Sequence, residues 1–539
     1  MTRRPTTRRR SPLRRRDLLI GGAGALGLAA LGGQGRAAVA PPSPPAPWPP
    51  APLSSSLWAV DVHCHTFCSA DLPIVGFVAH FIPGLTELSR FVSRWPEIVV
   101  RALVGAVATL PNAGAPSGDA ELAMLRAALA HPAGGVLAPV PTLPPEVLEA
   151  LLAELTKHLP FSVGVDKQRI IVRYLQTLYL VAHPRASIAA SIAQLFPSIA
   201  LFTPALVDYD AWSDDRAPTP LWQQVLLQES IARLSVQGRI GRPDARFHPF
   251  VAFDPRRQIE GPQGAAPPQG LPARLAPAIP SAASSALELV RYAIEVGGFL
   301  GVKLYPPVGF APSDNVHLRP ELSFAAGLDG ALDGLYGYCE GGEVPILTHA
   351  GPSNEYGLGL RELVAPARWS PVLARHPTLR LNFGHFGHDY GVAVERPPGG
   401  LREGWIYQAA ALIDRYPNVY ADLSNSPLVY DAAYGERLAR LLAEVIARYP
   451  KVRRRIMYGS DWWLSGLDPN AAAAVGQFRA LLGGLLGADG LADLMGRNAL
   501  RFLGFLDDDG RPRAGASAAR LRRFYGGVPA PGWLPPARS

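Results

Sequence analysis

The stretch LWAVDVHCH, residues 57–65, joins an apolar run of β type to two histidines that stand two positions apart. On a strand, side chains two residues apart point to the same side, so His63 and His65 can face one cavity. Two imidazoles suit zinc, iron, nickel or copper better than calcium. An H-x-H pair is weak evidence when it stands alone, and the prediction of a metal site therefore depends on the rest of the chain.

Seven further apolar runs of β type follow this stretch, and patterns typical of helices separate them. The seven are Ile199–Val207, Phe247–Phe253, Phe299–Leu304, Val344–Leu347, Leu379–Phe383, Val419–Leu423 and Ile456–Tyr458. Together with Leu57–Val62 they make eight runs. Eight strands that alternate with helices predict an α/β fold, a (β/α)8 TIM barrel in which a parallel sheet is closed and surrounded by helices. Active sites of such barrels form at the C-terminal ends of the strands.

Residues of the metal-binding or proton-transferring type stand at four other strand ends. His349 follows the fifth run, His385 follows the sixth, Asp461 follows the eighth and Lys303 stands near the end of the fourth. The chain has only 12 histidines, so this concentration at predicted strand ends is not expected by chance. Asp71 could also face the cavity, but a role in a turn or helix cap fits it equally well.

This set of motifs resembles the amidohydrolase superfamily and, within it, the amidohydrolase-related (type 2) family. That family has H-x-H on strand one, His on strands five and six, and Asp on strand eight. The segment GRNAL, residues 496–500, resembles its terminal helix motif. The resemblance spans roughly Trp58 to Gly504 and implies a TIM-barrel, metal-dependent hydrolase. It is a poor guide to the substrate, because the family includes hydrolases, decarboxylases and hydratases.

The resemblance also implies roles for single residues. His63, His65 and His349 would be metal ligands, and Asp461 would be either a ligand or a base held beside the metal. His385 would polarise the substrate or transfer a proton. The expected cofactor is a divalent transition metal, zinc before any other. If there are two metals, Lys303 and His385 would help to hold the second.

The function expected from these motifs is that of a metal-dependent hydrolase, which activates water for attack on a carbonyl group. A bound metal lowers the pKa of its water to about 7 and polarises the carbonyl. The substrate would be a small molecule with an amide, ester or lactone bond. Two alternatives remain open at this point: a metal-dependent, non-oxidative decarboxylase of an aromatic or unsaturated acid, and a catalytically inactive binding barrel.

The order of motifs predicts the organisation of the chain. Residues 1–40 resemble a twin-arginine signal peptide, because Arg15 and Arg16 precede an apolar run of about 14 residues, which is too short to span a membrane. The predicted segments after it are a Pro-rich linker (41–56), the barrel (57–505) with a mostly helical insertion (66–195) and a loop insertion (256–285), and a C-terminal tail (506–539). The expected location is the periplasm or the extracellular space.

The net charge of +8 is not a nucleic-acid signal. Residues 1–40 contain nine arginines and one aspartate, which accounts for the whole excess, so the rest of the chain is close to neutral. We therefore expect no nucleic-acid partner, and no stable membrane insertion after export. The three cysteines do not resemble a disulfide framework, and the oligomeric state is left open.

Overall fold

The computed structural model describes residues 59–73, 115–131, 134–141, 146–147, 149–150, 179–213, 215–261, 278–351, 360–387, 404–425, 432–462 and 473–536. The predicted signal peptide and linker lie outside these residues, as does most of the predicted helical insertion. The predicted domain boundaries therefore stay predictions. Within the described part, no helix combines the length and the apolar character that crossing a membrane requires.

Every β run expected from the sequence contains a strand. The strands are β1 (Ala59–Cys64), β2 (Ile199–Pro204), β3 (Arg246–Phe247), β4 (Phe250–Ala252), β5 (Gly301–Leu304), β6 (Ile346–His349), β7 (Leu381–Gly384), β8 (Val419–Asp422) and β9 (Ile456–Met457). They form two sheets, ordered β1-β2-β3 and β4-β5-β6-β7-β8-β9, and all neighbours are parallel. The expected α/β class with parallel strands is confirmed.

Strands β3 and β4 correspond to one expected run that is interrupted at Pro249. The amide of His248 still donates to the carbonyl of Phe202 at 3.0 Å, and the amide of Leu300 donates to the carbonyl of Pro249 at 2.9 Å. Proline has no N–H group and cannot continue a ladder on both sides. The interruption therefore has a local chemical cause, and the chain continues in the same direction across it.

The two sheets adjoin at both of their edges. At one edge the amide of Leu206 donates to the carbonyl of Phe250 at 3.0 Å, beside a parallel bridge between Ala205 and Phe250. At the other edge the amide of Val62 donates to the carbonyl of Tyr458 at 3.2 Å. The end of β1 consequently lies beside the chain that leaves β9.

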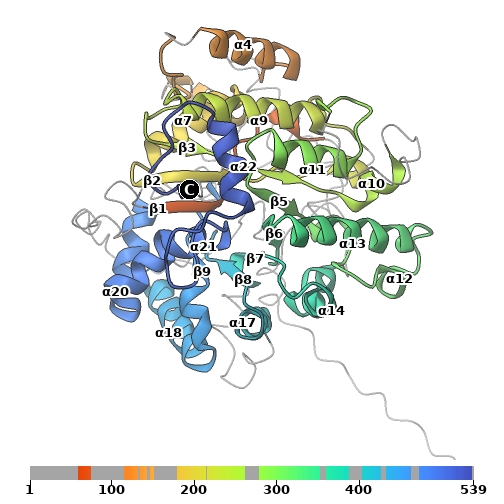
Figure 1. Cartoon of the computed structure of the whole chain (residues 1–539), viewed down its shortest axis with the longest axis vertical. Helices are drawn as coiled ribbons and strands as arrows, with labels where there is room; N and C mark the ends of the chain where they lie inside the picture. Colours follow the sequence, from red (N-terminus) through yellow and green to blue (C-terminus); the bar gives the residue numbers. More distant parts are fainter. Residues whose placement is uncertain are drawn as a thin grey trace, which may run out of the picture.

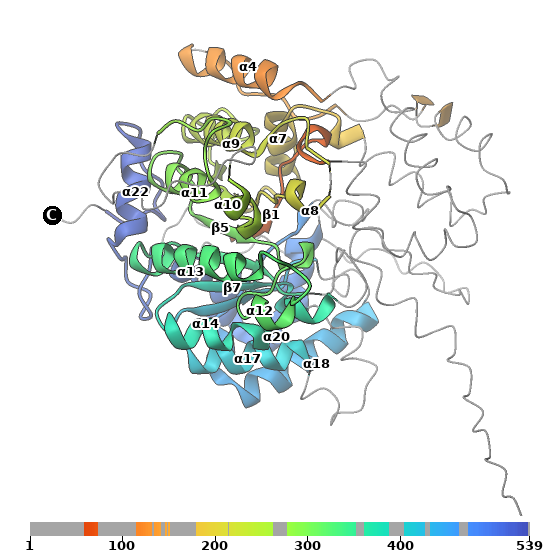
Figure 2. The same ribbon diagram turned by 90° about the vertical axis from the view of Figure 1, so that its right-hand side faces the viewer.

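The helices lie around the strands (Figures 1 and 2). They are α4 (Gly118–Ala130), α7 (Arg185–Leu195), α8 (Asp210–Ser213), α9 (Leu221–Val236), α10 (Pro255–Glu260), α11 (Ala286–Glu295), α12 (Asn315–Leu318), α13 (Ala325–Gly341), α14 (Ser370–Arg375), α17 (Trp405–Arg415), α18 (Ala432–Arg448), α20 (Ala474–Ala492), α21 (Asn498–Phe502) and α22 (Ala516–Tyr525). Helix α11 begins with a capping box, in which Ser285 and Glu288 satisfy each other's backbone amides.

Short helical turns complete the described chain: η1 (Ser69–Asp71), η3 (Pro306–Val308), η4 (Arg361–Val364), η5 (Pro366–Trp369), η6 (His385–Gly387), η8 (Pro450–Arg454) and the π-helical turn η10 (Asp493–Arg497). Helices α4 and α7 fall within the predicted insertion at 66–195, and α4 packs against α9. The predicted loop at 256–285 begins inside helix α10 instead. The Asp254 carboxylate accepts a hydrogen bond from the amide of Arg256 and so caps this helix.

The C-terminal segment packs against the strands. Helix α21 begins at Asn498, whose side-chain amide donates to the carbonyl of Ile456 at 2.8 Å and so ties the GRNAL segment to β9. Phe502, Tyr525 and Trp533 share one buried apolar cluster with strand residues that include Val60, Leu201, Leu347 and Met457. The tail beyond 505 therefore contributes to the core.

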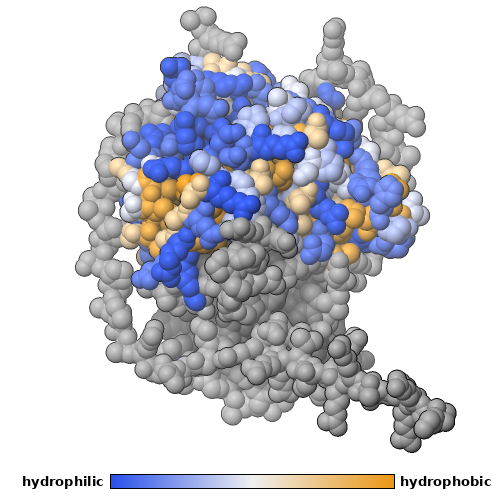
Figure 3. Space-filling model, turned by 90° about the horizontal axis from the view of Figure 1, so that it is seen from below, coloured by the Kyte–Doolittle hydropathy of each residue, from blue (hydrophilic) through white to orange (hydrophobic). Residues whose placement is uncertain are grey.

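The exposed surface of the described residues is mainly hydrophilic on the face that Figure 3 shows, with small hydrophobic patches between polar residues. The large hydrophobic side chains that are exposed in this part of the molecule come from separate elements: Met124, Val136, Ile279, Val296, Val316 and Val528. Isolated exposed hydrophobic residues of this kind are normal for a globular protein.

Candidate metal centre

The end of β1 brings His63 and His65 together with Asp461. The two imidazole rings lie 5.5 Å apart, and Nε2 of His65 lies 3.3 Å from Oδ1 of Asp461. One ligand-type atom from each of these residues falls within a group no wider than 4.8 Å. The three residues can therefore contact one ion.

Each imidazole of the H-x-H pair is held through its Nδ1 atom. Nδ1 of His63 lies 3.2 Å from Oδ2 of Asp422, and Nδ1 of His65 lies 2.8 Å from the carbonyl oxygen of Ala205. A carbonyl oxygen only accepts, so Nδ1 of His65 carries the proton and Nε2 keeps its lone pair in the neutral ring. Histidines that bind metals almost always have such a partner on the other nitrogen.

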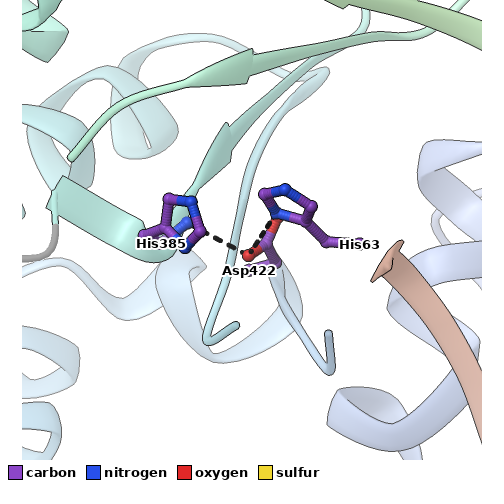
Figure 4. Close-up of side chains that lie close together, drawn as sticks. All are labelled: His63, His385 and Asp422. Atoms are coloured by element: carbon purple, nitrogen blue, oxygen red, sulfur yellow. Dashed lines mark hydrogen bonds and ion pairs between the residues drawn. The ribbon is translucent and has the colours of Figure 1, made fainter. Parts of the chain in front are cut away.

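Asp422, at the end of β8, is a site residue that the sequence analysis missed. It accepts hydrogen bonds from Asn382 Nδ2 at 2.7 Å, the amide of His385 at 3.0 Å and the amide of Ser424 at 3.1 Å. Figure 4 shows this carboxylate between His63 and His385, with which it forms a second group of ligand-type atoms. Because its oxygens already accept several hydrogen bonds, we assign Asp422 to orienting His63 rather than to binding the ion.

The sequence contains one feature that could have identified Asp422 as a site residue. Asp422 is the only charged residue in the expected run Val419–Leu423, and it stands one residue before the C-terminal end of that run. Burial would raise its pKa, but the His63 and His385 charges and the hydrogen bonds from His63 and Ser424 hold that pKa well below its usual range. Asp422 is therefore an anion that favours a proton on Nδ1 of His63.

The segment Gly459–Asp461 lies against the end of β1. The amide of Asp461 donates to the carbonyl of His63 at 2.7 Å. A Cβ atom at position 459 would meet Cβ of His63 at 2.9 Å, so glycine allows the close approach. Burial would raise the pKa of Asp461, but its contacts with His65, His385 and His63 hold that pKa below its usual range. An ionised carboxylate at this position suits either a ligand or a general base.

The other predicted site residues lie in the same buried cluster. Nζ of Lys303 lies 3.0 Å from Nε2 of His63, and the ring of His385 lies 4.7 Å from the ring of His63. Nε2 of His385 lies 3.3 Å from Nδ1 of His349. His349 is in neither group of ligand-type atoms found among the described residues. Burial lowers the pKa of Lys303 to about 8 and that of His385 to about 4.

Two tyrosines lie beside these residues, on the chain that follows β2 and β5. The ring of Tyr305 meets the ring of His349 edge to face at 4.8 Å, and the ring of Tyr209 meets that of Tyr305 at 5.4 Å. Tyr209 was not singled out from the sequence, because no motif marks it. The pair forms an aromatic edge next to the histidines.

The donor set fits a divalent transition metal. It combines two imidazoles held by Nδ1 hydrogen bonds with one ionised carboxylate, all close together and largely buried. Imidazole nitrogen and carboxylate oxygen are ligands that zinc accepts, whereas calcium takes oxygen ligands almost alone. The residues present therefore match the chemistry of the cofactor that the motifs imply.

Residues 261–505 match the family model described as amidohydrolase. The matched segment includes Lys303, His349, His385 and Asp461, and the structure places these beside the H-x-H pair that precedes it. This segment belongs to the amidohydrolase superfamily. The match confirms the type 2 branch, which the motifs at the strand ends indicate.

The solved structures that are similar to this chain have low sequence identity to it. A protein described as amidohydrolase II has 13% sequence identity, covers 59% of this chain and 88% of its own, and has a TM-score of 0.38. An amidohydrolase from Burkholderia multivorans with bound zinc has 16% identity, coverage of 38% and 64%, and a TM-score of 0.27. An uncharacterised TIM-barrel protein from Bordetella bronchiseptica has 15% identity, coverage of 68% and 96%, and a TM-score of 0.33. No curated protein sequence matches the chain.

Proposed function

We propose that this amidohydrolase is a metal-dependent hydrolase of small molecules with an amide, ester or lactone bond. One observation carries the proposal: His63, His65 and Asp461 converge, and each of the two imidazoles is oriented through Nδ1. His349, whose Nδ1 lies 3.3 Å from Nε2 of His385, would complete the ligand set. Zinc is the metal that we expect first.

The proposed fold of the site is an eight-stranded barrel, in which β3 and β4 act as one strand. The hydrogen bonds from Leu206 to Phe250 and from Val62 to Tyr458 support a closed arrangement, because they join the two sheets at both edges. A barrel of this kind would gather all strand ends that carry site residues on one side of the molecule.

A bound divalent metal would supply a Lewis acid and lower the pKa of water at the site. The ionised carboxylate of Asp461 would take a proton from the attacking water and give it to the leaving group. His385 would donate a hydrogen bond to the substrate, and the edge formed by Tyr209 and Tyr305 would contact its apolar part. Lys303 and His385 would contribute to a second metal position if two ions are bound.

The same proposal includes export. Arg15 and Arg16, followed by an apolar run, support transport by the twin-arginine route, which carries folded proteins. An enzyme on this route can acquire its metal in the cytoplasm before it reaches the periplasm or the medium.

The deciding experiment is metal analysis of protein purified from its natural compartment, followed by chelation and reconstitution. We expect one or two equivalents of a transition metal, loss of activity on chelation and recovery with added zinc. His63→Ala should lose the metal, whereas His317→Ala, an exposed histidine on α12, should retain it. Full activity of metal-free protein would contradict the proposal.

The substrate class is tested by a screen of esters, lactones and amides alongside aromatic and unsaturated acids. Hydrolysis of a carbonyl bond with no release of carbon dioxide supports the proposal. Release of carbon dioxide from an acid, with no hydrolysis of any of the other compounds, would favour a decarboxylase instead.

A further inference from the structure

Asp61 and Ser460 connect the end of β1 to the segment that carries Asp461. Oδ2 of Asp61 accepts a hydrogen bond from the Ser460 hydroxyl at 2.6 Å, and Oδ1 accepts from the Ser460 amide at 2.9 Å. Oδ1 also accepts from the amide of His63 at 3.2 Å. One carboxylate thus holds the backbone of His63, a proposed metal ligand, and of Ser460, the residue that precedes the proposed ligand Asp461.

Both members of this contact are removed from solvent. Asp61 is 0% exposed and Ser460 is 6% exposed, so the hydrogen bonds form in a medium of low polarity, where they restrict geometry strongly. The amide of Asp461 donates to the carbonyl of His63 at 2.7 Å directly beside them. The two chain segments are therefore joined by hydrogen bonds on consecutive residues.

The backbone at this junction needs such support. Asp461 has a φ angle of 45°, in the left-handed region that residues other than glycine rarely adopt. Gly459 is packed between β1 and the chain after β8, since a Cβ atom there would meet Cβ of His63 at 2.9 Å and Cβ of Ser424 at 3.0 Å. A non-glycine residue keeps a left-handed conformation only when surrounding contacts impose it, and such residues concentrate at functional sites.

We propose that Asp61 and Ser460 form a latch that positions the Asp461 carboxylate opposite His63 and His65. The latch acts through other residues, so Asp61 and Ser460 are positioning residues rather than ligands. This role rests on the proposed metal-dependent function, because its purpose is to set the distance between a carboxylate and two imidazoles.

The latch is tested with Asp61→Ala, Asp61→Asn and Ser460→Ala in the full-length protein. Asparagine can preserve the contact, since its amide oxygen accepts from the two backbone amides and its amide nitrogen can donate to the Ser460 hydroxyl. Asp329→Ala is the matched control. The Asp329 carboxylate on α13 also accepts three hydrogen bonds from another segment, from the amides of Asn315 and Val316 and from the Asn315 side chain.

The first readout is the affinity for Co²⁺ together with the visible absorption spectrum of the cobalt-loaded protein, which reports the geometry of the ligands. We expect Asp61→Ala and Ser460→Ala to bind cobalt about 10- to 100-fold more weakly, the usual effect of removing an outer partner of a ligand, and to show an altered spectrum. Asp61→Asn should approach the wild-type values, and Asp329→Ala should match them despite a lower Tm. Wild-type affinity and spectrum in Asp61→Ala would overturn the latch.

The second readout needs no metal. Hydrogen exchange of the Asp461 amide in metal-free protein should be faster in Asp61→Ala than in wild type, slow in Asp61→Asn and unchanged in Asp329→Ala. Wild-type protein that binds no cobalt would refute the metal-dependent function, whereas faster exchange in Asp61→Ala would still support the latch. Unchanged exchange in that variant would overturn the latch irrespective of metal binding.

Discussion

The Nδ1 atom of His63 lies 3.2 Å from Oδ2 of Asp422, although the two residues are 359 positions apart in the chain. The contact joins the end of β1 to the end of β8. It directs Nε2 of His63 toward Lys303, whose Nζ atom lies 3.0 Å away. The orientation of the first proposed metal ligand thus depends on a carboxylate from a strand of the other sheet.

Asp422→Asn should weaken metal binding without unfolding the protein. The amide can still accept a hydrogen bond, but it carries no charge to stabilise the proton on Nδ1 of His63. We expect the affinity for zinc to fall about 10- to 100-fold, measured by competition with a chelator. Asp333→Asn, an exposed change on α13, is the control and should bind zinc normally. Equal affinity in the two variants would show that the charge of Asp422 is not used.

Asp461→Asn should retain much of the metal and lose most of the turnover. The histidines remain as ligands and the amide oxygen of asparagine can still coordinate, but an amide does not accept a proton at neutral pH. Removal of a positioned general base typically costs about 10²–10⁴-fold in rate. The measurement is turnover at saturating zinc, with occupancy determined on the same sample. Turnover close to that of the wild type would exclude Asp461 as the base and transfer the role to His385.

Arg185→Met should destabilise the fold and make its stability more dependent on pH. The Arg185 guanidinium, which is 0% exposed, donates to Asp71 at 2.8 and 2.6 Å and also to Glu121. Without it both buried carboxylates lose their shared cation, a loss of about 3–5 kcal/mol at neutral pH. Arg185→Lys, which keeps the charge, should lose less.

The sign of the pH effect follows from the two carboxylates. Burial already raises the pKa of Asp71 and of Glu121 above their usual values, and removal of Arg185 would raise both further. A group whose pKa is raised by folding binds its proton more tightly in the native state, so folding is favoured as the pH falls. The deficit of Arg185→Met should therefore be smaller at pH 5 than at pH 8 in urea unfolding. An equal deficit at both values would contradict this reading of the contact.

Replacement of Arg15 and Arg16 by lysine should block export. The twin-arginine pair is the predicted recognition element of the leader, and charge alone would not replace it. The same double change at Arg8 and Arg9, outside the motif, preserves charge and is the control. Cell fractionation should find the first variant folded in the cytoplasm and the second exported. Normal export of both variants would mean that the leader uses another route.

The strands were predictable because their signal is local. Each expected β run contains a strand, and the third run is divided only where Pro249 removes a backbone donor. The positions of His63, His349, His385 and Asp461 at strand ends could also be read from the chain, since parallel strands place those ends at the same side of a sheet. The loop expected at 256–285 was less predictable, because the cap formed by Asp254 starts helix α10 within a stretch rich in proline and glycine.

What the sequence determined by itself was the class of fold and the set of candidate site residues, because apolar periodicity and residue type act over a few neighbouring positions. Only the tertiary structure decided which nitrogen of each histidine faces the centre, that Asp422 and Asp61 hold the site, and that Asp71, which could have faced the cavity, pairs with Arg185 instead. These contacts join segments separated by up to several hundred residues. Their partners are selected by strand order, register and the exclusion of water from buried charges, which act only once the whole chain has packed.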